Sequence, residues 1–417
     1  MSGYNKRQMQ ASNTTAQNVE KPSHTTTLGR VESIDILRAL TMVLMIFVND
    51  LWSLNNIPAW LGHVEYGVDG IGLADVIFPA FLFIVGLSLP LSIDNRRAKG
   101  ETDWQLIQHV LLRSLALLIM GVFLVNGETI NAAATGMSRV VWYTICCACF
   151  ILIWNAFPRK ISKYVVRGIQ GSALLVLLIL AIVYRGGTDN EISTFEPQWW
   201  GILGLIGWAY LVSATITVLA HNRITLIAVV WLFFAALSMI SHAGLFPEFL
   251  NFIPSPVAGG TLTALTIGGV LTALIFKHFK VSEKHVALTL VLLGFAAVLV
   301  LLYAVTRPYW GLAKLGETPA WLFLCSAFTI IAFVIFYWII DVYQKAHWFT
   351  IIKPAGTATL LCYLIPYFAY ATMSLPGADL PEWALTGGIG LIKSFLFALL
   401  CVGITGLLVR VGIRFKV

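Results

Sequence analysis

The chain has 417 residues, of which 58% are hydrophobic and 11% are charged, and its formal net charge is +7. A soluble domain carries about 25% charged residues, so this composition excludes an ordinary soluble enzyme and indicates an integral membrane protein. The surplus of lysine and arginine is expected to fix orientation in the bilayer, and no nucleic-acid partner is expected.

Residues 1–30 are polar and rich in Ser, Thr, Asn and Gln, which predicts a disordered cytoplasmic tail without a cleavable signal peptide. Residues 31–417 are predicted to form a single, all-α transmembrane domain. About twelve apolar segments follow, each near the roughly 17–25 residues that a membrane crossing needs. They lie near 36–54, 73–93, 107–125, 139–157, 170–184, 200–219, 225–242, 260–277, 286–305, 320–340, 356–373 and 390–409.

Lysine and arginine concentrate in alternate loops, as is typical of a cytoplasmic face. The basic positions are in segments 1–30, 96–99 and 159–167, at Arg223, and in segments 277–284, 345–353 and 410–416. Both termini are therefore predicted to be cytoplasmic. Of the eight histidines, only His63 and His242 then lie at the outer face. The tryptophans predicted to form an interfacial belt there are Trp52, Trp60, Trp199, Trp200, Trp310 and Trp321.

The first apolar segment carries a polar stripe. Asp35, Arg38, Met42, Met45 and Asn49 recur at spacings of three and four, so they share one face of a helix. The rise from first to last is about 21 Å at 1.5 Å per residue, most of a roughly 30 Å hydrocarbon core. This helix would therefore place polar groups at both faces of the membrane.

His63 follows in a short loop, and Asp75 opens the next apolar segment. Neutral imidazole is the usual general base near neutral pH, and a carboxylate partner fixes its tautomer. The pattern alone also fits an exposed loop histidine.

Arg38 and Asp35 are predicted at the cytoplasmic end, where an arginine fork suits phosphate. A plain Asp–Arg pair that anchors the helix fits the pattern too. Arg113 lies inside the third apolar segment. An ionisable residue at that depth indicates function, unless it reaches back to the interface.

Asn49 and Asp50 close the first helix, and both should face the protein interior or a wet cavity. Arg139 is interpreted either as a neutralising partner of one of the carboxylates or as a substrate contact. Lys314 and Glu317 form either a substrate contact or a solvated loop pair.

The six cysteines are predicted to be buried packing residues without disulfide or metal spacing. The glycines of segment 260–269 predict close helix packing.

Several of these stretches carry a resemblance to a known family. They are SIDILRAL at 33–40, MIFVN at 45–49, His63, and GLADVIFPAFLFIVGLS at 72–88, with weaker matches around Arg113, near Gly260 and before Asp341. Together they resemble the heparan-α-glucosaminide N-acetyltransferase family and its bacterial relatives, which are transmembrane acyltransferases.

The resemblance implies transfer of acetyl from cytoplasmic acetyl-CoA to the amine of a glucosamine-type sugar at the outer face, without a metal. It places the active-site histidine on His63, the helix asparagine on Asn49 and a phosphate-binding arginine on Arg38. Asp75 would orient His63. Arg113 and Asp35 would complete the acetyl-CoA site, and Asp50, Arg139 and Lys314 would contact the acceptor. A homodimer in a bacterial inner membrane is also implied.

The chain departs from the family pattern at SRVVWYTICC (138–147), at KPAGTATLL (353–361) and in two additional segments near 200–242. These departures leave the acceptor sugar open. The alternative function is a sugar or amino-sugar permease of the inner membrane, because twelve helices with polar ends also fit a secondary transporter. Such a transporter is expected to show internal repeats with broken helices, and none is evident in the sequence.

Overall fold

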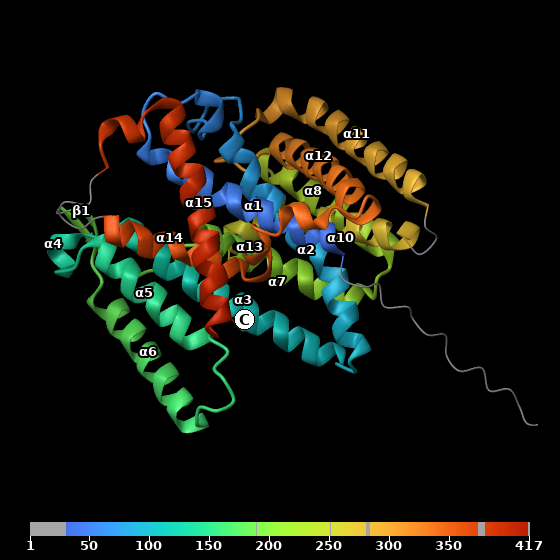
Figure 1. The fold of residues 1–417 in the computed structure, drawn as a ribbon. Helices are drawn as coiled ribbons and strands as arrows, with labels where there is room; N and C mark the ends of the chain where they lie inside the picture. The colour runs from blue at the N-terminus through green and yellow to red at the C-terminus, as the bar shows by residue number, and fades with distance from the viewer. Residues whose placement is uncertain (1–30, 189, 251, 281–283, 374–379, 416–417) are drawn as a thin grey trace, which may run out of the picture.

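The computed structural model describes residues 31–188, 190–250, 252–280, 284–373 and 380–415. The predicted disordered tail, residues 1–30 with its basic residues, lies outside the described part. The described chain is almost entirely helical (Figure 1). The longer helices are α1 (Glu32–Asp50), α2 (Leu73–Ala98), α3 (Asp103–Glu128), α5 (Arg139–Trp154), α6 (Lys163–Val183), α7 (Ile202–Ala220), α8 (Ile224–His242), α10 (Thr261–Lys280), α11 (His285–Trp310), α12 (Pro319–Phe336), α14 (Thr359–Met373) and α15 (Gly387–Arg410).

Short elements connect these helices. They are η1 (Leu51–Ser53), η2 (Ala59–Leu61), α4 (Ala132–Thr135), η3 (Glu248–Leu250), α9 (Ser255–Ala258), the π-helical η4 (Tyr337–Val342), η5 (Ala346–Phe349), α13 (Lys353–Thr357) and η6 (Glu382–Leu385). The strands β1 (Gly186–Thr188) and β2 (Glu191–Ser193) pair antiparallel, with Gly187 opposite Ile192. The prediction of an all-α chain is therefore correct apart from this small hairpin.

Nine helices among the described residues are long and apolar enough to cross a membrane by length and composition. They are α2, α3, α6, α7, α8, α10, α11, α12 with its π-helical extension, and α15. The apolar helices α5 and α14 are shorter, and α1 carries Glu32, Asp35, Arg38 and Asp50. Each of the twelve predicted apolar segments is thus helical, and an all-α polytopic membrane protein is confirmed.

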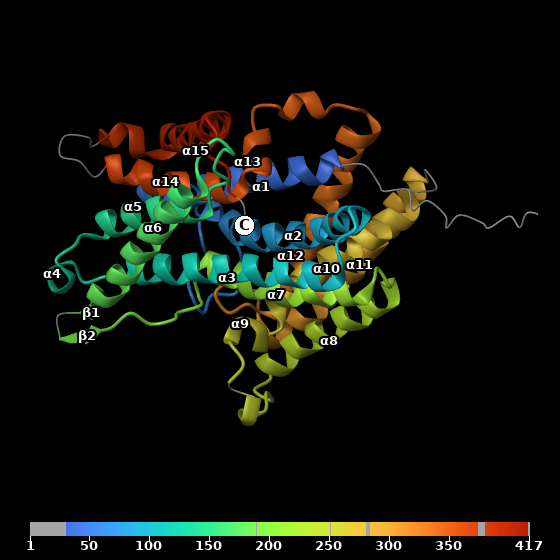
Figure 2. The ribbon, with the colours of Figure 1, turned by 90° about the horizontal axis from the view of Figure 1, so that it is seen from below.

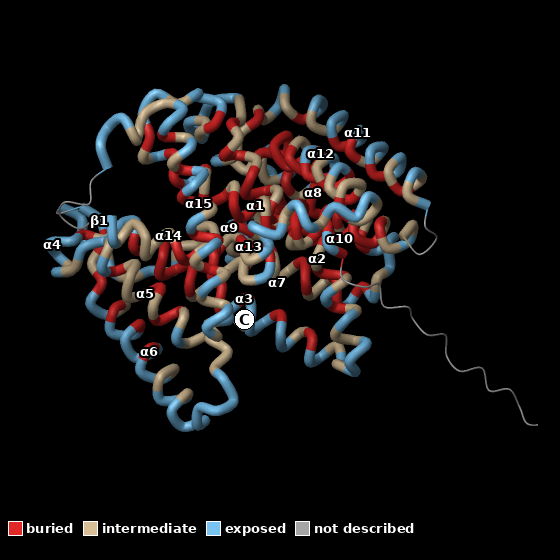
Figure 3. The backbone as a smooth tube through the Cα atoms, in the orientation of Figure 1, coloured by how far each residue is buried: buried red, intermediate tan, exposed pale blue. Residues whose placement is uncertain are grey.

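Helices α2 and α10 form the centre of the bundle. In Figure 3 the buried backbone concentrates around α1, α2, α10 and α12, whereas α6 and α11 are mostly exposed at its periphery. Figure 2 shows α15 and α8 on opposite sides of this centre. The exposed faces of α6 and α11 are leucine-, isoleucine- and valine-rich, as expected for surfaces that contact lipid.

Glycines allow α2 and α10 to pack backbone against backbone. A Cβ added at Gly86 would lie 1.9 Å from the carbonyl oxygen of Thr266, and one at Gly269 would lie 1.9 Å from that of Phe83. Helix α7 approaches α3 in the same way, because a Cβ at Gly121 would lie 2.5 Å from the nitrogen of Gly204. The close packing predicted for segment 260–269 is confirmed, and small residues are what membrane helices use for it.

The C-terminal end of α1 is joined to α14 and α15 through Asp50, which faces the protein interior as predicted. Its buried carboxylate accepts hydrogen bonds from Tyr370 Oη (2.9 Å), Ser394 Oγ (2.6 Å) and Lys393 Nζ (2.8 Å). Three partners satisfy the charge of Asp50 in a region that water barely reaches, which is the condition for burying an ion pair. Lys393, rather than Arg139, neutralises this carboxylate.

All six cysteines are free and buried, as predicted. The prediction of a tryptophan belt is wrong for Trp321. Trp52, Trp60 and Trp200 are exposed, but Trp321 is fully buried, because its indole nitrogen donates to the Asp75 carbonyl oxygen (2.9 Å) across the α2–α12 interface. Trp321 therefore belongs to the protein interior.

The glycine contact gives a first prediction. Gly269→Ala should lower the thermal unfolding midpoint in detergent by several degrees, because the new methyl group must separate α10 from α2. The matched control is Gly294→Ala on α11, where nothing lies within 4 Å of an added Cβ. The control should leave the midpoint unchanged or raise it slightly through better helix propensity. Equal midpoints for the two variants would contradict the account of the core.

The Asp50 cluster gives a second prediction. Asp50→Ala should lower the free energy of unfolding by about 3–5 kcal/mol, because it leaves the half-buried Lys393 without its carboxylate partner. The double variant Asp50→Ala with Lys393→Met should be more stable than Asp50→Ala alone, because no unpaired charge remains. Thermal unfolding of Asp50→Ala, of Lys393→Met and of the double variant measures this coupling. Additive effects of the two substitutions would contradict an interaction between Asp50 and Lys393.

Candidate active site

The loop between α1 and α2 is closed by two glycines. A Cβ on Gly72 would lie 1.9 Å from the carbonyl oxygen of Gly62, so only glycine allows the two ends of segment 62–72 to touch. This closure sets His63 directly beside the first turn of α2, where Asp75 is the third residue of the helix. Local backbone geometry therefore assembles the predicted pair of His63 and Asp75.

Asp75 is the fixed member of that pair. Its carboxylate is 1% exposed; Oδ2 accepts from the backbone nitrogens of Val64 (3.0 Å) and Gly72 (3.0 Å), and Oδ1 lies 2.7 Å from His63 Nδ1. A carboxylate with these donors only accepts hydrogen bonds, so Nδ1 of His63 carries the hydrogen. Nε2 is then the basic nitrogen, and the ring is 45% exposed, so a reactant can reach it.

Lys314, from the loop between α11 and α12, completes the cluster. Its Nζ lies 3.2 Å from His63 Nδ1 and 4.0 Å from Asp75 Oδ1. Because Nδ1 donates to Asp75, Lys314 acts here as a neighbouring cation rather than as a donor to the ring. Burial lowers the pKa of Lys314, and the charge of Asp75 opposes this shift. Residues far apart in sequence thus meet at one site.

A cavity of about 590 Å³, here called the Arg38 cavity, runs between α1, α2, α3, α7 and the chain near its C-terminal end. Arg38, Arg113 and Arg414 all line it, with Ser88 and Ser92 of α2 and with apolar residues such as Met42 and Met45. Its walls combine several arginine side chains with an apolar passage. That combination suits a ligand with phosphate groups and a long, weakly polar arm.

The arginines of the Arg38 cavity are held differently. Arg38 pairs with Asp35 and donates to the Gly356 carbonyl (2.9 Å) and to Ser88 Oγ (3.2 Å), so it is preorganised and joins α1 to α13. Arg113 is exposed on α3, and its guanidinium lies 5.1 Å from the centre of the Tyr210 ring. Arg113 makes no ion pair within the described residues and is therefore available to a phosphate.

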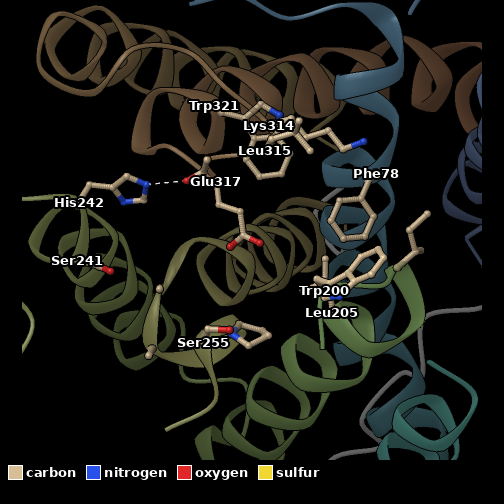
Figure 4. Close-up of a pocket in the computed structure, with 15 residues that line it drawn as sticks. Phe78, Trp200, Leu205, Ser241, His242, Ser255, Lys314, Leu315, Glu317 and Trp321 are labelled. Atoms are coloured by element: carbon tan, nitrogen blue, oxygen red, sulfur yellow. Dashed lines mark hydrogen bonds between the residues drawn. The ribbon is translucent and has the colours of Figure 1, made fainter. Parts of the chain in front are cut away.

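A second cavity of about 600 Å³, here called the Glu317 cavity, lies between α2, α7, α8, α9 and the α11–α12 loop (Figure 4). Phe78, Trp200 and Trp321 supply aromatic walls, and Ser241 and Ser255 supply hydroxyl groups. In Figure 4 the carboxylate of Glu317 points into this space, while the amine of Lys314 is directed toward α2. Lys314 thus lines the cavity and also touches His63.

The two cavities adjoin each other. Ile202, the first residue of α7, lines both. On α2, Phe78 belongs to one and Phe81 to the other, which are one helical turn apart. The Arg38 cavity ends at Phe81, about 9 Å along the helix from Asp75 at 1.5 Å per residue. Along α2, the His63–Asp75 pair at the first turn is therefore followed by the Glu317 cavity at Phe78 and then by the Arg38 cavity from Phe81 onward.

His63, Asp75 and Asp35 are not among the residues that line either cavity, and the remaining predicted site residues also lie outside both. Asn49 is exposed, one turn of α1 beyond Met45. Asp50 is buried in its contacts with Tyr370, Lys393 and Ser394. Arg139, at the start of α5, donates to the Glu128 carbonyl oxygen (2.6 Å) on the surface.

The sequence interpretation missed two features of the site. Arg414 was interpreted only as a marker of orientation, and its position opposite Arg38 and Arg113 depends on how the end of the chain folds back. Lys314 and Glu317 were interpreted as a loop pair or a joint substrate contact, yet they diverge: one side chain reaches Asp75 and the other enters the cavity. No periodicity in the sequence could have separated them.

Comparisons with known proteins agree with the resemblance. Residues 30–205 match the family model described as heparan-alpha-glucosaminide N-acetyltransferase, catalytic. Heparan-alpha-glucosaminide N-acetyltransferase of Homo sapiens is 31% identical over 101 residues, and that of Mus musculus is 32% identical over 102 residues. The matched parts cover 23% and 24% of this chain and 14% of each relative. The matched range contains every predicted site residue except Lys314, and the predicted resemblance is confirmed over it.

The position of Lys314 yields a prediction about its protonation. Because burial lowers its pKa, Lys314 should react with an amine-directed acylating reagent at lower pH than Lys99, which is exposed at the end of α2. Asp75→Asn removes the charge that opposes the shift, so the reaction midpoint of Lys314 should fall further. Mass spectrometry of labelled peptides across a pH series measures both midpoints. A reaction midpoint of Lys314 that rises in Asp75→Asn would contradict the electrostatic contact between Lys314 and Asp75.

Proposed function

We propose, from the kinship of residues 30–205 to the heparan-α-glucosaminide N-acetyltransferase family, that this protein is a transmembrane acetyltransferase. It takes acetyl from acetyl-CoA on the cytoplasmic side and places it on the amine of a glucosamine-type sugar on the outer side. The observation that carries the proposal is the grouping along α2 of the His63–Asp75 pair, a cavity with aromatic residues in its lining and a cavity lined by arginines, in that order.

Acetyl-CoA would enter the Arg38 cavity with its phosphates near Arg38, Arg113 and Arg414. Asp35 supports this site indirectly, because it pairs with Arg38. The pantetheine arm would run past Met42, Met45 and Phe81, whose side chains line the apolar part of the cavity. The thioester then arrives about one helical turn from Asn49 on α1, close to the His63 loop.

The chemical step follows from the state of His63. The acceptor amine attacks the thioester carbonyl while Nε2 of His63 removes its proton, and CoA leaves as the thiolate. Asp75 keeps Nδ1 protonated and stabilises the imidazolium that forms. Asn49 would donate to the oxyanion, a contact worth about 2.7–4 kcal/mol in preorganised sites. Attack by His63 itself, through an acetyl-histidine intermediate, is the competing route.

Of the residues predicted to contact the acceptor, Lys314 has the geometry best suited to it, since it lies between His63 and the Glu317 cavity. For Asp50 we propose a structural role, because its carboxylate already accepts hydrogen bonds from three side chains. Arg139 is retained only as a contact for a large acceptor, because it lies on the surface.

The membrane arrangement is part of the proposal. We assign crossings to α1, α5 and α14 in addition to the nine long helices, which gives twelve, with both termini in the cytoplasm. Basic loops at 96–99 and 159–167 support this orientation through the positive-inside rule. A bacterial inner membrane and a homodimer complete the proposal.

A direct test uses purified protein in detergent. Addition of acetyl-CoA and glucosamine should release free CoA and form N-acetylglucosamine. Sealed vesicles that take up sugar at the same rate with and without acetyl-CoA, and protein that releases no CoA, would instead favour the permease.

His63→Ala should reduce transfer at least a hundredfold, because general acid–base catalysis typically contributes about 10²–10⁴-fold. His109→Ala is the matched control, since His109 is exposed on α3 and its Nε2 lies 3.6 Å from Glu101 on the surface. CoA release at saturating substrates measures both. Wild-type rates in His63→Ala would remove His63 from the catalytic role.

Arg113→Ala should raise the apparent KM for acetyl-CoA by roughly tenfold or more, because a hydrogen bond to a charged group is worth about 1.5–3 kcal/mol. Arg38→Ala should do the same, with some loss of thermal stability because Arg38 also holds α13. Arg167→Ala, on the exposed face of α6, is the control. An unchanged KM in both cavity variants would place the co-substrate elsewhere.

A further inference from the structure

The turn that carries Glu317 is held in an unfavourable backbone conformation. Glu317 has φ +50, in the left-handed region that glycine and asparagine occupy far more readily. Such strain persists only where surrounding contacts over-determine it, and it concentrates at functional positions.

Two helices, α8 and α10, fix the turn. His242 of α8 places Nε2 2.8 Å from the Gly316 carbonyl oxygen and Nδ1 2.8 Å from that of Ser238. Thr261, the first residue of α10, donates to the Glu317 carbonyl oxygen (2.8 Å) and shares a hydrogen bond with Ser238 Oγ (2.6 Å). All of these contacts hold the backbone of the turn. None of them engages the Glu317 carboxylate.

The carboxylate instead projects into the Glu317 cavity (Figure 4). Within the described residues no side chain or backbone group donates a hydrogen bond to it, and the nearby cation of the same loop, Lys314, is directed to Asp75. Burial raises the pKa of Glu317 to about 7. Burying a charged carboxylate without a partner is unfavourable in free energy. The Glu317 carboxylate is therefore available to bind a ligand.

We infer that Glu317 binds the protonated amine of the acceptor, and that the Glu317 cavity is the acceptor site, with Phe78 and Trp200 against the sugar ring. This inference rests on the proposed function, and it deepens it by assigning amine recognition to a loop outside residues 30–205. An ammonium group supplies the missing charge, and aromatic walls suit a pyranose face. The hydroxyl groups of Ser241 and Ser255 are available to the sugar.

The contact between Glu317 and the amine also provides an acceptor for a proton that His63 does not take. An amine bound as ammonium must lose one proton before nitrogen can attack, and a second as the new C–N bond forms. Glu317 takes the first proton, becomes a neutral acid and releases it to water in the cavity. The neutral amine then attacks the thioester, His63 takes the second proton, and CoA leaves with the electron pair of the broken C–S bond.

The test separates recognition from chemistry. Ligand-induced shifts of the thermal unfolding midpoint are measured without acetyl-CoA for glucosamine, glucose and N-acetylglucosamine. The proteins are wild type, Glu317→Gln, and Glu248→Gln as a control on an exposed carboxylate of η3. Wild type and the control should bind glucosamine at least tenfold more tightly than the two neutral sugars. Glu317→Gln should bind all three about equally.

CoA release is then measured for the same proteins. Glu317→Gln should raise KM for glucosamine at least tenfold and leave KM for acetyl-CoA within about twofold. If the variant keeps the wild-type preference for glucosamine while CoA release continues, the inference fails and the transferase proposal stands. If wild type releases no CoA but Glu317→Gln still loses the preference, the amine site stands and the transferase proposal fails.

Discussion

The position of one buried carboxylate governs the whole site. Asp75 is held by two backbone nitrogens, by the Nδ1 of His63 and, through its own carbonyl oxygen, by Trp321. These contacts come from the α1–α2 loop and from α12, so any shift of α2 against α12 would disturb the imidazole. The glycine-mediated packing of α2 on α10 makes such shifts difficult, because the two backbones are already in contact.

From this fixed point the polar groups are arranged along α2 in an order that matches a reaction across a membrane. Arginines lie near its second half, an apolar passage follows, and the His63–Asp75 pair and a second cavity lie at its start. Among the described residues, Ile202 is the one that the linings of both cavities share, so the two cavities meet at the start of α7.

Much of this could be predicted from sequence, for identifiable reasons. Apolar segments of membrane length revealed the helices, and spacing on one helix face grouped Arg38, Met42 and Met45, which do line one cavity. The proximity of His63 and Asp75 was predictable because only a short loop separates them. The roles of Arg414, Trp321 and Glu317 were not, because they depend on contacts between segments hundreds of residues apart or on a strained turn. Asp50 shows the same limit: a polar residue at a helix end could not be assigned its partners Lys393 and Tyr370 in advance.

The central claim is that acetyl crosses the bilayer through this protein while acetyl-CoA and the acceptor stay on opposite sides. Vesicles with uniformly oriented protein, with acetyl-labelled acetyl-CoA sealed on the side of the basic loops and glucosamine only on the other, test it most directly. The account predicts labelled N-acetylglucosamine in the glucosamine compartment, with free CoA retained on the other side. Product that forms only when both substrates share a compartment would contradict it.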